Sequence, residues 1–393
     1  MDFIVNNFIF YGLCTHMKKA KKITIHYPYT PNYNMVFLDQ LLQISDHDYI
    51  LYTDKRSSDG IEFGNVNSDL TVREAPIRKL SGIWFSTNLV SHLLRDRPDV
   101  FVVNGNPRDL GTFLVMLIGI FTRTKIVAWG MFHRIGEPRL VTTFYFWLCG
   151  VLCDANFTYA RIGKISQVAR GTRSSKIHVI GTAIADRNSV GEVTFGDKLR
   201  VINELGLDSF LNSGDFVILQ VMRLSSIKKP ELLMELMSKL ASNDKNIKLV
   251  LAGGGPLEDW FKAKVLDAGL TGSIALLGPI YDSEKLAILY DIADVTVVPT
   301  CIGLTAHQSL SYNVPVITDN SVTNQASEFE ILVNGYNSVI YEEGDISELS
   351  EIIESLFDDR DFLNHLKSNC TVSLEQHSIR KKALRFLRAI KTL

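Results

Sequence analysis

Short apolar runs alternate with segments of helical periodicity along most of this chain. In the first half, runs with strand character are separated by stretches in which apolar residues recur every three or four positions. Such alternation is typical of parallel sheets covered by helices, because a parallel strand needs a crossover connection. The expected strands are 23–26, 49–52, 100–104, 125–129 and 155–158, and the expected helices are 36–44, 83–95, 110–121 and 140–152.

The second half repeats this plan after a polar connector, residues 183–212, that lacks a sustained strand pattern. Two similar α/β halves predict two Rossmann-like domains that face each other across a cleft. The expected strands are 216–221, 248–252, 273–277, 295–298, 314–318 and 338–341. The expected helices are 231–240, 257–268, 283–291, 306–312, 346–357 and 360–368.

The length of 393 residues suits two domains of roughly 100–200 residues each. We expect an extension of little structural weight at 1–16, because Met17 and four lysines lead directly into the first strand. The first domain is expected at 17–190 and the second domain at 191–372. Residues 373–393 are expected to form a helix that returns to the first domain.

Composition excludes several classes of protein. The net charge of -2 provides no basic field for nucleic acid. The five cysteines form no CxxC pair and no metal-ligand spacing, which indicates reduced thiols in a cytoplasmic protein and no metal site. No signal peptide is expected, because Asp2 precedes the apolar part and no cleavage site follows.

Two segments raise the question of membrane contact. The apolar run 112–121 is about half as long as a membrane span requires. We expect a buried helix there, with a helix face that touches a membrane as the alternative. The tail 379–393 is basic and amphipathic, and we expect a solvated helix face in preference to a membrane-contacting surface.

A pair of basic residues indicates what the second half binds. Arg223 and Lys228 follow the apolar run 216–222 and precede a helical stretch. In an open α/β sheet, ligands bind outside the carboxyl ends of the strands. Two cations at such an end, beside a helix start, suit a phosphate or diphosphate.

Further loops follow the strands of the second half. Gly254 is the middle glycine of a run that would let backbone approach a ligand closely. After the next strand, Ile280 and Tyr281 could contact a flat base. A loop at Gly303 opens a helix near Leu304 and Thr305, which again suits an anion. Neither a Gly-x-Gly-x-x-Gly fingerprint nor a Walker-type phosphate loop occurs, which disfavours an NAD enzyme.

The ordered set of these motifs resembles the retaining GT-B glycosyltransferases of family 4, the group-1 glycosyl transferases. The matching elements are Arg-Leu-x-x-x-Lys, Gly-Gly-Gly-Pro, Leu-Gly-x-x, Ala-Asp-Val-x-x-x-Pro, Gly-Leu and Pro-Val-Ile, between residues 216 and 341. The resemblance implies that Arg223 and Lys228 hold the diphosphate of a nucleotide sugar. It implies that Ile280 and Tyr281 contact the base.

The chain departs from this family at two acidic positions. Thr300 and Gln308 stand where the family usually has two glutamates, one by the donor sugar and one on the ribose. Gln308 can still hydrogen-bond a ribose hydroxyl, whereas Thr300 supplies no carboxylate. Glu330 fits the family's Pro-Glu-Ile position although Phe329 replaces the proline. The pattern looks like a subgroup of bacterial surface-polysaccharide transferases (O-antigen and capsule) that also lacks the first glutamate.

The first half is then expected to bind the acceptor. Tyr29 and Asn32 lie in an aromatic and hydroxyl-rich loop after the first strand, which is either a sugar-stacking surface or an ordinary turn. Asn104, Asn106 and Arg108 follow another strand and could reach the cleft. His133 follows a third strand, and we expect it to contact the reacting sugar or the acceptor, with a structural role as the alternative.

The sequence therefore predicts transfer of one sugar from a nucleotide diphosphate sugar to a polyprenyl-diphosphate-linked, growing glycan. The resemblance implies retention of configuration, no metal and no cofactor. The expected location is the cytoplasm, at the inner face of the cell membrane. Two alternatives remain open: a sugar-nucleotide epimerase on the same fold, and a non-catalytic nucleotide-sugar or glycan-binding protein.

Overall fold

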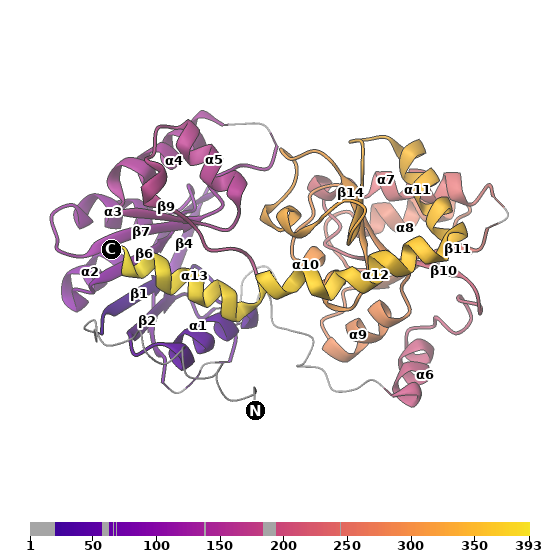
Figure 1. Ribbon diagram of the computed structural model, residues 1–393, viewed down its shortest axis with the longest axis horizontal. Helices are drawn as coiled ribbons and strands as arrows, with labels where there is room; N and C mark the ends of the chain where they lie inside the picture. The colour runs from indigo at the N-terminus through magenta and orange to yellow at the C-terminus, as the bar shows by residue number, and fades with distance from the viewer. Residues whose placement is uncertain are drawn as a thin grey trace, which may run out of the picture. The chain divides into compact units, whose positions relative to one another are not determined.

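The computed structural model describes residues 20–56, 63–65, 67, 69–136, 139–183, 194–243 and 245–393 (Figure 1). The expected extension 1–16 and the expected domain boundary at 190/191 lie outside these residues. The contacts of the chain divide it into two compact units, one that ends at Ala128 and one that begins at Trp129. Among the described residues, no helix is long and apolar enough to cross a membrane.

The first sheet has seven strands in the order β3-β2-β1-β6-β7-β8-β9. The registers of β1 with β2 and β6, and of β8 with β9, are parallel. Its strands are β1 (Lys22–His26), β2 (Asp48–Thr53), β3 (Thr71–Glu74), β6 (Val100–Asn104), β7 (Lys125–Gly130), β8 (Ala155–Thr158) and β9 (Ile177–Val179). The helices between them are α1 (Asn32–Ile44), α2 (Leu89–Asp96), α3 (Leu110–Gly119), α4 (Leu140–Leu152) and α5 (Arg161–Ala169). These elements form the first α/β domain.

The expected helix 83–95 is wrong over its first part. Strands β4 (Ile77–Leu80) and β5 (Ile83–Ser86) form an antiparallel hairpin instead, and helix α2 begins only at Leu89. The hairpin turns at Ser81 and Gly82, which both have positive φ (48° and 81°). Two such residues form the tight turn that suits the twist of paired strands.

The second sheet has six strands in the order β12-β11-β10-β13-β14-β15, and every pair is parallel. Its strands are β10 (Phe216–Val221), β11 (Ile247–Ala252), β12 (Ile274–Gly278), β13 (Val295–Val298), β14 (Val316–Asp319) and β15 (Ser338–Tyr341). The helices are α7 (Glu231–Leu240), α8 (Glu258–Asp267), α9 (Ser283–Asp291), α10 (Thr305–Ser311), α11 (Ile346–Asp358) and α12 (Arg360–Leu374). The strands and helices expected for this second domain are confirmed, with ends that agree closely with the predicted ones.

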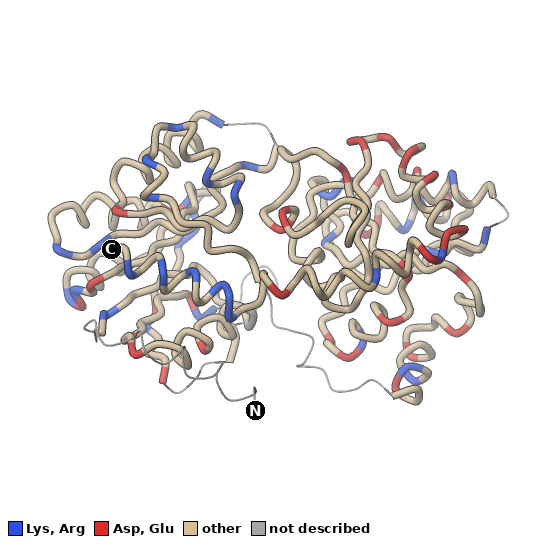
Figure 2. Tube along the Cα trace, in the orientation of Figure 1, with Lys and Arg blue, Asp and Glu red and all other residues tan. Residues whose placement is uncertain are grey.

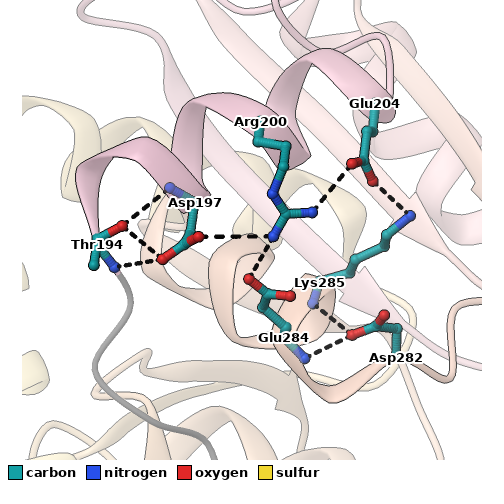
Figure 3. A network of polar contacts seen from close by, with 7 residues as sticks. All are labelled: Thr194, Asp197, Arg200, Glu204, Asp282, Glu284 and Lys285. Atoms are coloured by element: carbon teal, nitrogen blue, oxygen red, sulfur yellow. Dashed lines mark hydrogen bonds and ion pairs between the residues drawn. The ribbon is translucent and has the colours of Figure 1, made fainter.

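Helix α6 (Phe195–Glu204) begins the second domain and is fastened to α9 by charged side chains (Figure 3). Arg200 pairs with Glu284 at 2.6 Å and with Glu204 at 3.1 Å, and Lys285 pairs with Glu204 at 3.0 Å. Thr194 and Asp197 form a capping box at the start of α6. Because these groups are exposed, each pair adds little stability alone. Together they fix where α9 begins.

The last helix, α13 (Ile379–Lys391), packs on the first sheet, as the sequence predicted. The ring of Phe386 is fully buried, 5.6 Å from Trp129 of β7 and 5.5 Å from Phe157 of β8. Ser378 caps the helix by accepting a hydrogen bond from the backbone N–H of Lys381. The apolar side of the tail is therefore used inside the protein.

Truncation of Phe386 should destabilise this packing. We expect Phe386→Ala to lower the free energy of unfolding by about 3–5 kcal/mol, because a fully buried ring leaves a cavity against two aromatic neighbours. Urea unfolding followed by tryptophan fluorescence measures the change. Arg388→Ala, an exposed position on the same helix, is the control and should leave the midpoint almost unchanged. Equal effects of the two variants would contradict the packing.

Candidate functional site

The second sheet has one position where the strand order reverses. Strands β10 and β13 are neighbours, and the sheet extends outward from them to β12 on one side and β15 on the other. Helices that follow adjacent strands then lie on opposite faces, so the carboxyl ends of β10 and β13 leave a crevice for a ligand. The loops that follow these two strands carry most of the residues expected to bind the donor.

The basic pair lies on the loop after β10. Arg223 is exposed, and among the described residues it has no hydrogen bond or ion pair to a protein group. Lys228 ends the short 3₁₀ helix η3 (Ser226–Lys228), and its ammonium donates to the backbone carbonyl of Cys301. Lys228 therefore links the loops after β10 and β13, while the guanidinium of Arg223 can bind an anion.

The glycine run packs against the segment that carries Arg223. Gly253 and Gly255 have φ of +159° and +153°. A Cβ at Gly253 would lie 1.8 Å from the carbonyl oxygen of Met222, and one at Gly255 would lie 2.5 Å from that of Leu224. The backbone N–H of Leu224 donates to the carbonyl of Gly254 at 3.0 Å. The close backbone approach expected at Gly254 is thus made to the Arg223 segment of the protein itself.

The loop after β13 is held in a strained conformation. Cys301 has a φ of 54°, which is unfavourable for a residue with a side chain. The N–H of Ile302 donates to Gln325 Oε1 at 2.7 Å, and the Thr305 hydroxyl donates to the carbonyl of Val221 at 3.0 Å. Thr305 is thereby brought to the end of β10, beside the basic pair.

Three other donor candidates surround this loop. A Cβ at Gly303 would meet nothing within 4 Å, so this backbone borders open space. Leu304 is exposed directly before α10, and Gln308 is half-buried on that helix. Helix α10 has only seven residues, which limits what its dipole contributes to anion binding.

The structure places a carboxyl group beside Thr300 that the sequence reasoning missed. Thr300 is buried, and its hydroxyl has no hydrogen bond among the described residues. It lies beside Asp319 at the end of β14. Burial raises the pKa of Asp319, although the Thr300 hydroxyl and the hydrogen bonds from Ser321 and Gln325 oppose the rise. The pairing of Thr300 with the end of another strand was not visible in the sequence.

A second missed carboxyl group is Glu328, in the short helix η4 (Ser327–Ile331). Burial raises the pKa of Glu328, and the ammonium groups of Lys382 and Lys228 act in the opposite direction. Glu328 therefore lies within electrostatic reach of one member of the basic pair. The sequence motif had directed attention to Glu330, two residues further on.

Glu330 is used differently from the expectation. Its Oε1 accepts a hydrogen bond of 3.1 Å from the backbone N–H of Ile162, in the first turn of α5. A carboxylate at a helix amino terminus satisfies a donor that has no partner within the helix. The structure thus gives Glu330 a helix-capping contact, and its contact with a donor stays a prediction.

The expected base-contacting residues follow β12. Tyr281 is 82% exposed, and Ile280 is half-buried against the apolar core of the domain. Asp282 follows directly, and its side chain accepts hydrogen bonds from Glu284 and Lys285 at the start of α9. The ion pairs of Figure 3 hold the first turn of α9 in place, so the loop that carries Tyr281 is anchored where it enters this helix.

His133 lies on the loop after β7, in the unit that begins at Trp129. Burial lowers its pKa, and backbone contacts with Met131, whose carbonyl oxygen lies 3.2 Å from Nδ1, and with Gln325 oppose the shift. The preceding Phe132 has a φ of 55°, so the loop is strained. A neutral imidazole can bind a hydroxyl, and this role for His133 stays a prediction.

The acceptor candidates are joined by a residue that the sequence reasoning missed. The ring of Trp84, on β5, lies 6.3 Å from that of Tyr29, and its backbone N–H donates to the carbonyl of Arg108 at 2.7 Å. The ammonium of Lys79 lies 5.3 Å from the centroid of each ring. The signal was the Ser81–Gly82 turn between the four-residue segments 77–80 and 83–86, which the prediction of a helix over 83–95 concealed.

The remaining acceptor candidates lie near the carboxyl ends of β1 and β6, and their contact with an acceptor stays a prediction. Asn104 is half-buried at the end of that strand. Asn106 Oδ1 accepts from the backbone N–H of Arg108 at 3.0 Å, and the side chain of Arg108 is exposed. Asn32 begins α1, and its side chain lies outside the described residues.

The fold is that of solved glycosyltransferases. HepE of Anabaena has been solved in complex with UDP and in complex with UDP-glucose. Its UDP complex matches this structure with a TM-score of 0.71 and 15% sequence identity, and the match covers 95% of this chain and 100% of HepE. A glycosyltransferase of Rickettsia africae has a TM-score of 0.72, 15% identity, and coverage of 95% and 99%. The class defined by the fold is therefore GT-B, with two Rossmann-like α/β domains.

The sequence comparisons find a family model and two named glycosyltransferases. Residues 206–371 match the family model of the glycosyl transferases group 1. EpsD of Bacillus subtilis, a glycosyltransferase by name, is 24% identical over 219 residues, or 56% of this chain and 52% of its own length. MJ1607 of Methanocaldococcus jannaschii, named an uncharacterized glycosyltransferase, is 26% identical over 171 residues, 43% and 41% of the two lengths. The chain spans about half the length of these relatives. The second domain thus carries the sequence signature of group 1 glycosyl transferases.

Substitution in the glycine run should displace the basic pair without unfolding the domain. We expect Gly255→Ala to weaken nucleotide binding at least tenfold, because its Cβ would force the Leu224 backbone, and Arg223 with it, to move. Calorimetry with UDP and other nucleoside diphosphates measures binding. Gly272→Ala, where a Cβ meets nothing within 4 Å, is the matched control. Wild-type affinity of a folded Gly255→Ala protein would contradict this dependence.

Stability should depend on pH through His307. This buried residue of α10 places Nε2 2.8 Å from the Thr182 hydroxyl, and burial lowers its pKa to about 3. The unfolded chain binds a proton near pH 6.5 and the folded chain does not. Neutral His307 therefore costs no stability above pH 6.5. Below it, the free energy of unfolding falls by about 1.4 kcal/mol per pH unit as the pH drops toward 3. Urea unfolding between pH 7 and pH 5 measures the slope.

His307→Gln should remove this part of the slope, and His365→Gln, at an exposed position, should not. The difference between the two variants isolates His307 from carboxyl groups that titrate in the same range. Parallel slopes for both variants would show that His307 does not carry the dependence.

Proposed function

We propose that this protein is a retaining glycosyltransferase that moves a sugar from a nucleotide diphosphate sugar to a growing, lipid-linked glycan. The observation that carries this proposal is the placement of Arg223 and Lys228 at the strand-order reversal of the second sheet. The UDP and UDP-glucose complexes of HepE and the glycosyltransferase names of the sequence relatives support it. The role that we propose is the synthesis of a bacterial surface polysaccharide.

In this reaction, the bond between the anomeric carbon and the diphosphate breaks while the acceptor oxygen bonds to the same carbon. The nucleoside diphosphate leaves with the electron pair of the broken bond, and its oxygen takes the proton that the acceptor hydroxyl loses. Negative charge thus grows on the diphosphate, where we place Arg223 and Lys228. Cations fixed in advance at such a position stabilise the transition state. This role requires neither metal nor cofactor, and both absences are part of the proposal.

We propose that Glu328 and Asp319 supply the acidic character that Thr300 and Gln308 lack. Glu328 lies within electrostatic reach of Lys228, and Asp319 lies beside Thr300. A carboxylate near the basic pair could orient the ammonium toward the diphosphate and accept a hydrogen bond from a sugar hydroxyl. Gln308 would contact the ribose through its amide.

We propose Tyr29 and Trp84 as the surface on which an acceptor sugar stacks. The ammonium of Lys79 lies near both rings. The exposed Arg108 lies on the loop whose backbone accepts a hydrogen bond from Trp84. Aromatic faces suit the apolar face of a sugar, and the cations suit a polyprenyl diphosphate. Such an acceptor would place the enzyme at the inner face of the cell membrane.

Removal of either basic side chain should weaken donor binding. We expect Arg223→Ala and Lys228→Ala to lower affinity for the cognate nucleotide sugar about 10–100-fold each, because each loses a charged contact to the diphosphate. Calorimetry with UDP-, GDP- and dTDP-sugars measures affinity. Lys229→Ala is the control, since this neighbouring lysine pairs with Glu343 at 3.4 Å. Unchanged affinity in both folded variants would remove the diphosphate site from the proposal.

The same donor distinguishes the alternatives. Conversion of the donor sugar without any acceptor would identify an epimerase. Donor binding with no transfer to glycolipid acceptors extracted from cells would identify a binding protein. Transfer of the sugar to the extracted glycolipid, with release of the nucleoside diphosphate, is the result that we expect.

A further inference from the structure

Helix α4 presents an apolar stripe on the surface of the first domain. Leu140 is 89% exposed and Phe144 is 59% exposed, and both lie on the same side of the helix as the exposed Trp147 and Val151. Their spacing of four, three and four residues follows the helix period. The rings of Phe144 and Trp147 stack at 5.6 Å. An exposed apolar stripe of this size indicates a contact surface rather than scattered surface residues.

The surroundings of this stripe are basic. Residues 139–183 contain one acidic residue, Asp154, and six basic residues: Arg139, Arg161, Lys164, Arg170, Arg173 and Lys176. Helix α4 itself carries no charged residue, and the basic residues lie directly before it, on α5 and after α5. Figure 2 shows acidic residues to be frequent in the second half of the chain. Helix α5 adds two exposed apolar side chains, Ile165 and Val168. We call the surface formed by α4, α5 and residues 170–176 the α4–α5 face.

A hollow of about 340 Å³ lies within this face, and its lining combines Trp147 and Val151 with Arg170, Arg173 and Lys176. Among the described residues, no carboxylate pairs with these three cations. Arg170 donates to the carbonyl of Ser166, and Lys176 donates to that of Cys153 at 2.9 Å. Arg173 is exposed and has no such bond. The hollow therefore offers positive charge beside apolar side chains.

We propose that the α4–α5 face docks on the surface of an anionic phospholipid bilayer. Leu140, Phe144 and Trp147 enter the interface between headgroups and acyl chains, where aromatic side chains are favoured. The cations of the hollow bind the phosphate of a lipid headgroup. A second copy of this chain fits less well, since it would bring two strongly basic surfaces together.

The two segments that the sequence offers as candidate membrane contacts, 112–121 and 379–393, bury apolar side chains inside the protein. The apolar side of α13 is buried, with Phe386 and Ile390 fully enclosed. Helix α3 buries Val115 and Met116 and exposes Leu114 and Leu117, so the run 112–121 is buried on one side only. Neither combines an apolar stripe with a basic hollow among the described residues.

Sedimentation with vesicles tests the proposal. The wild-type protein is expected to bind vesicles of phosphatidylcholine mixed with phosphatidylglycerol and to bind pure phosphatidylcholine far more weakly. Leu140→Ser/Phe144→Ser removes the apolar contact, and Arg139→Glu/Arg173→Glu reverses two exposed charges. Each pair should reduce partitioning at least tenfold. The apolar pair loses two side chains from the membrane interface. The charge pair loses two basic residues, each of which contributes about fivefold near an anionic surface.

Matched pairs elsewhere on the surface control for hydrophobicity and charge. Phe195→Ser/Leu266→Ser removes two exposed apolar side chains of the second domain, and Lys381→Glu/Lys391→Glu reverses two exposed charges of α13. Both control pairs should bind vesicles like the wild type. Equal losses in test and control pairs, or no binding by the wild type, would overturn the proposal.

Two other results would also overturn it. Self-association that Leu140→Ser/Phe144→Ser abolishes, without vesicle binding, would assign the face to a second copy of the chain. Inorganic phosphate could also abolish vesicle binding as effectively as removal of the anionic lipid does. The hollow would then be a phosphate site. The assay needs no donor and no turnover, so its outcome is separate from that of the glycosyltransferase proposal.

Discussion

The position of the basic pair depends on a backbone contact. The run from Gly253 to Gly255 packs against the segment from Met222 to Leu224 so closely that no side chain fits between them. This contact fixes how the chain leaves β10, and so where Arg223 projects. Lys228 then reaches the loop after β13, whose strained Cys301 presents a carbonyl to it. The crevice of the second domain is thus set by glycines that need not touch a ligand themselves.

The sequence predicted the second domain well because its strands are apolar runs bounded by glycine, proline or polar residues. β10, β13 and β15 have the predicted ends, and α7 and α9 do as well. The first domain was harder. Residues 83–95 have helical spacing, yet the Ser81–Gly82 turn draws the first of them into a hairpin. Strands as short and exposed as β4 leave little periodicity to read.

The site was predictable only where a residue follows its strand directly. Arg223 and Lys228 could be placed because β10 is an unmistakable apolar run. Asp319 and Glu328 could not, because the proximity of Asp319 to Thr300 comes from the pairing of β13 with β14, and that of Glu328 to Lys228 from the packing of η4. Glu330 shows the converse, since a motif position can carry a helix-capping contact instead. Motif position identifies the loop, whereas the fold decides which side chain of that loop faces the crevice.

The contact of α13 with the first sheet has a consequence for how the chain is made. Phe386 packs on Trp129 and Phe157, but the whole second domain lies between them in the sequence, so Phe386 is synthesised much later. Until α13 has been made, the apolar side chains of the first sheet that it covers lack their partner, while the second domain is translated and can fold. The nascent chain therefore depends on α13 to complete its first domain, and a chain that stops before α13 would leave those side chains open to chaperones and proteases.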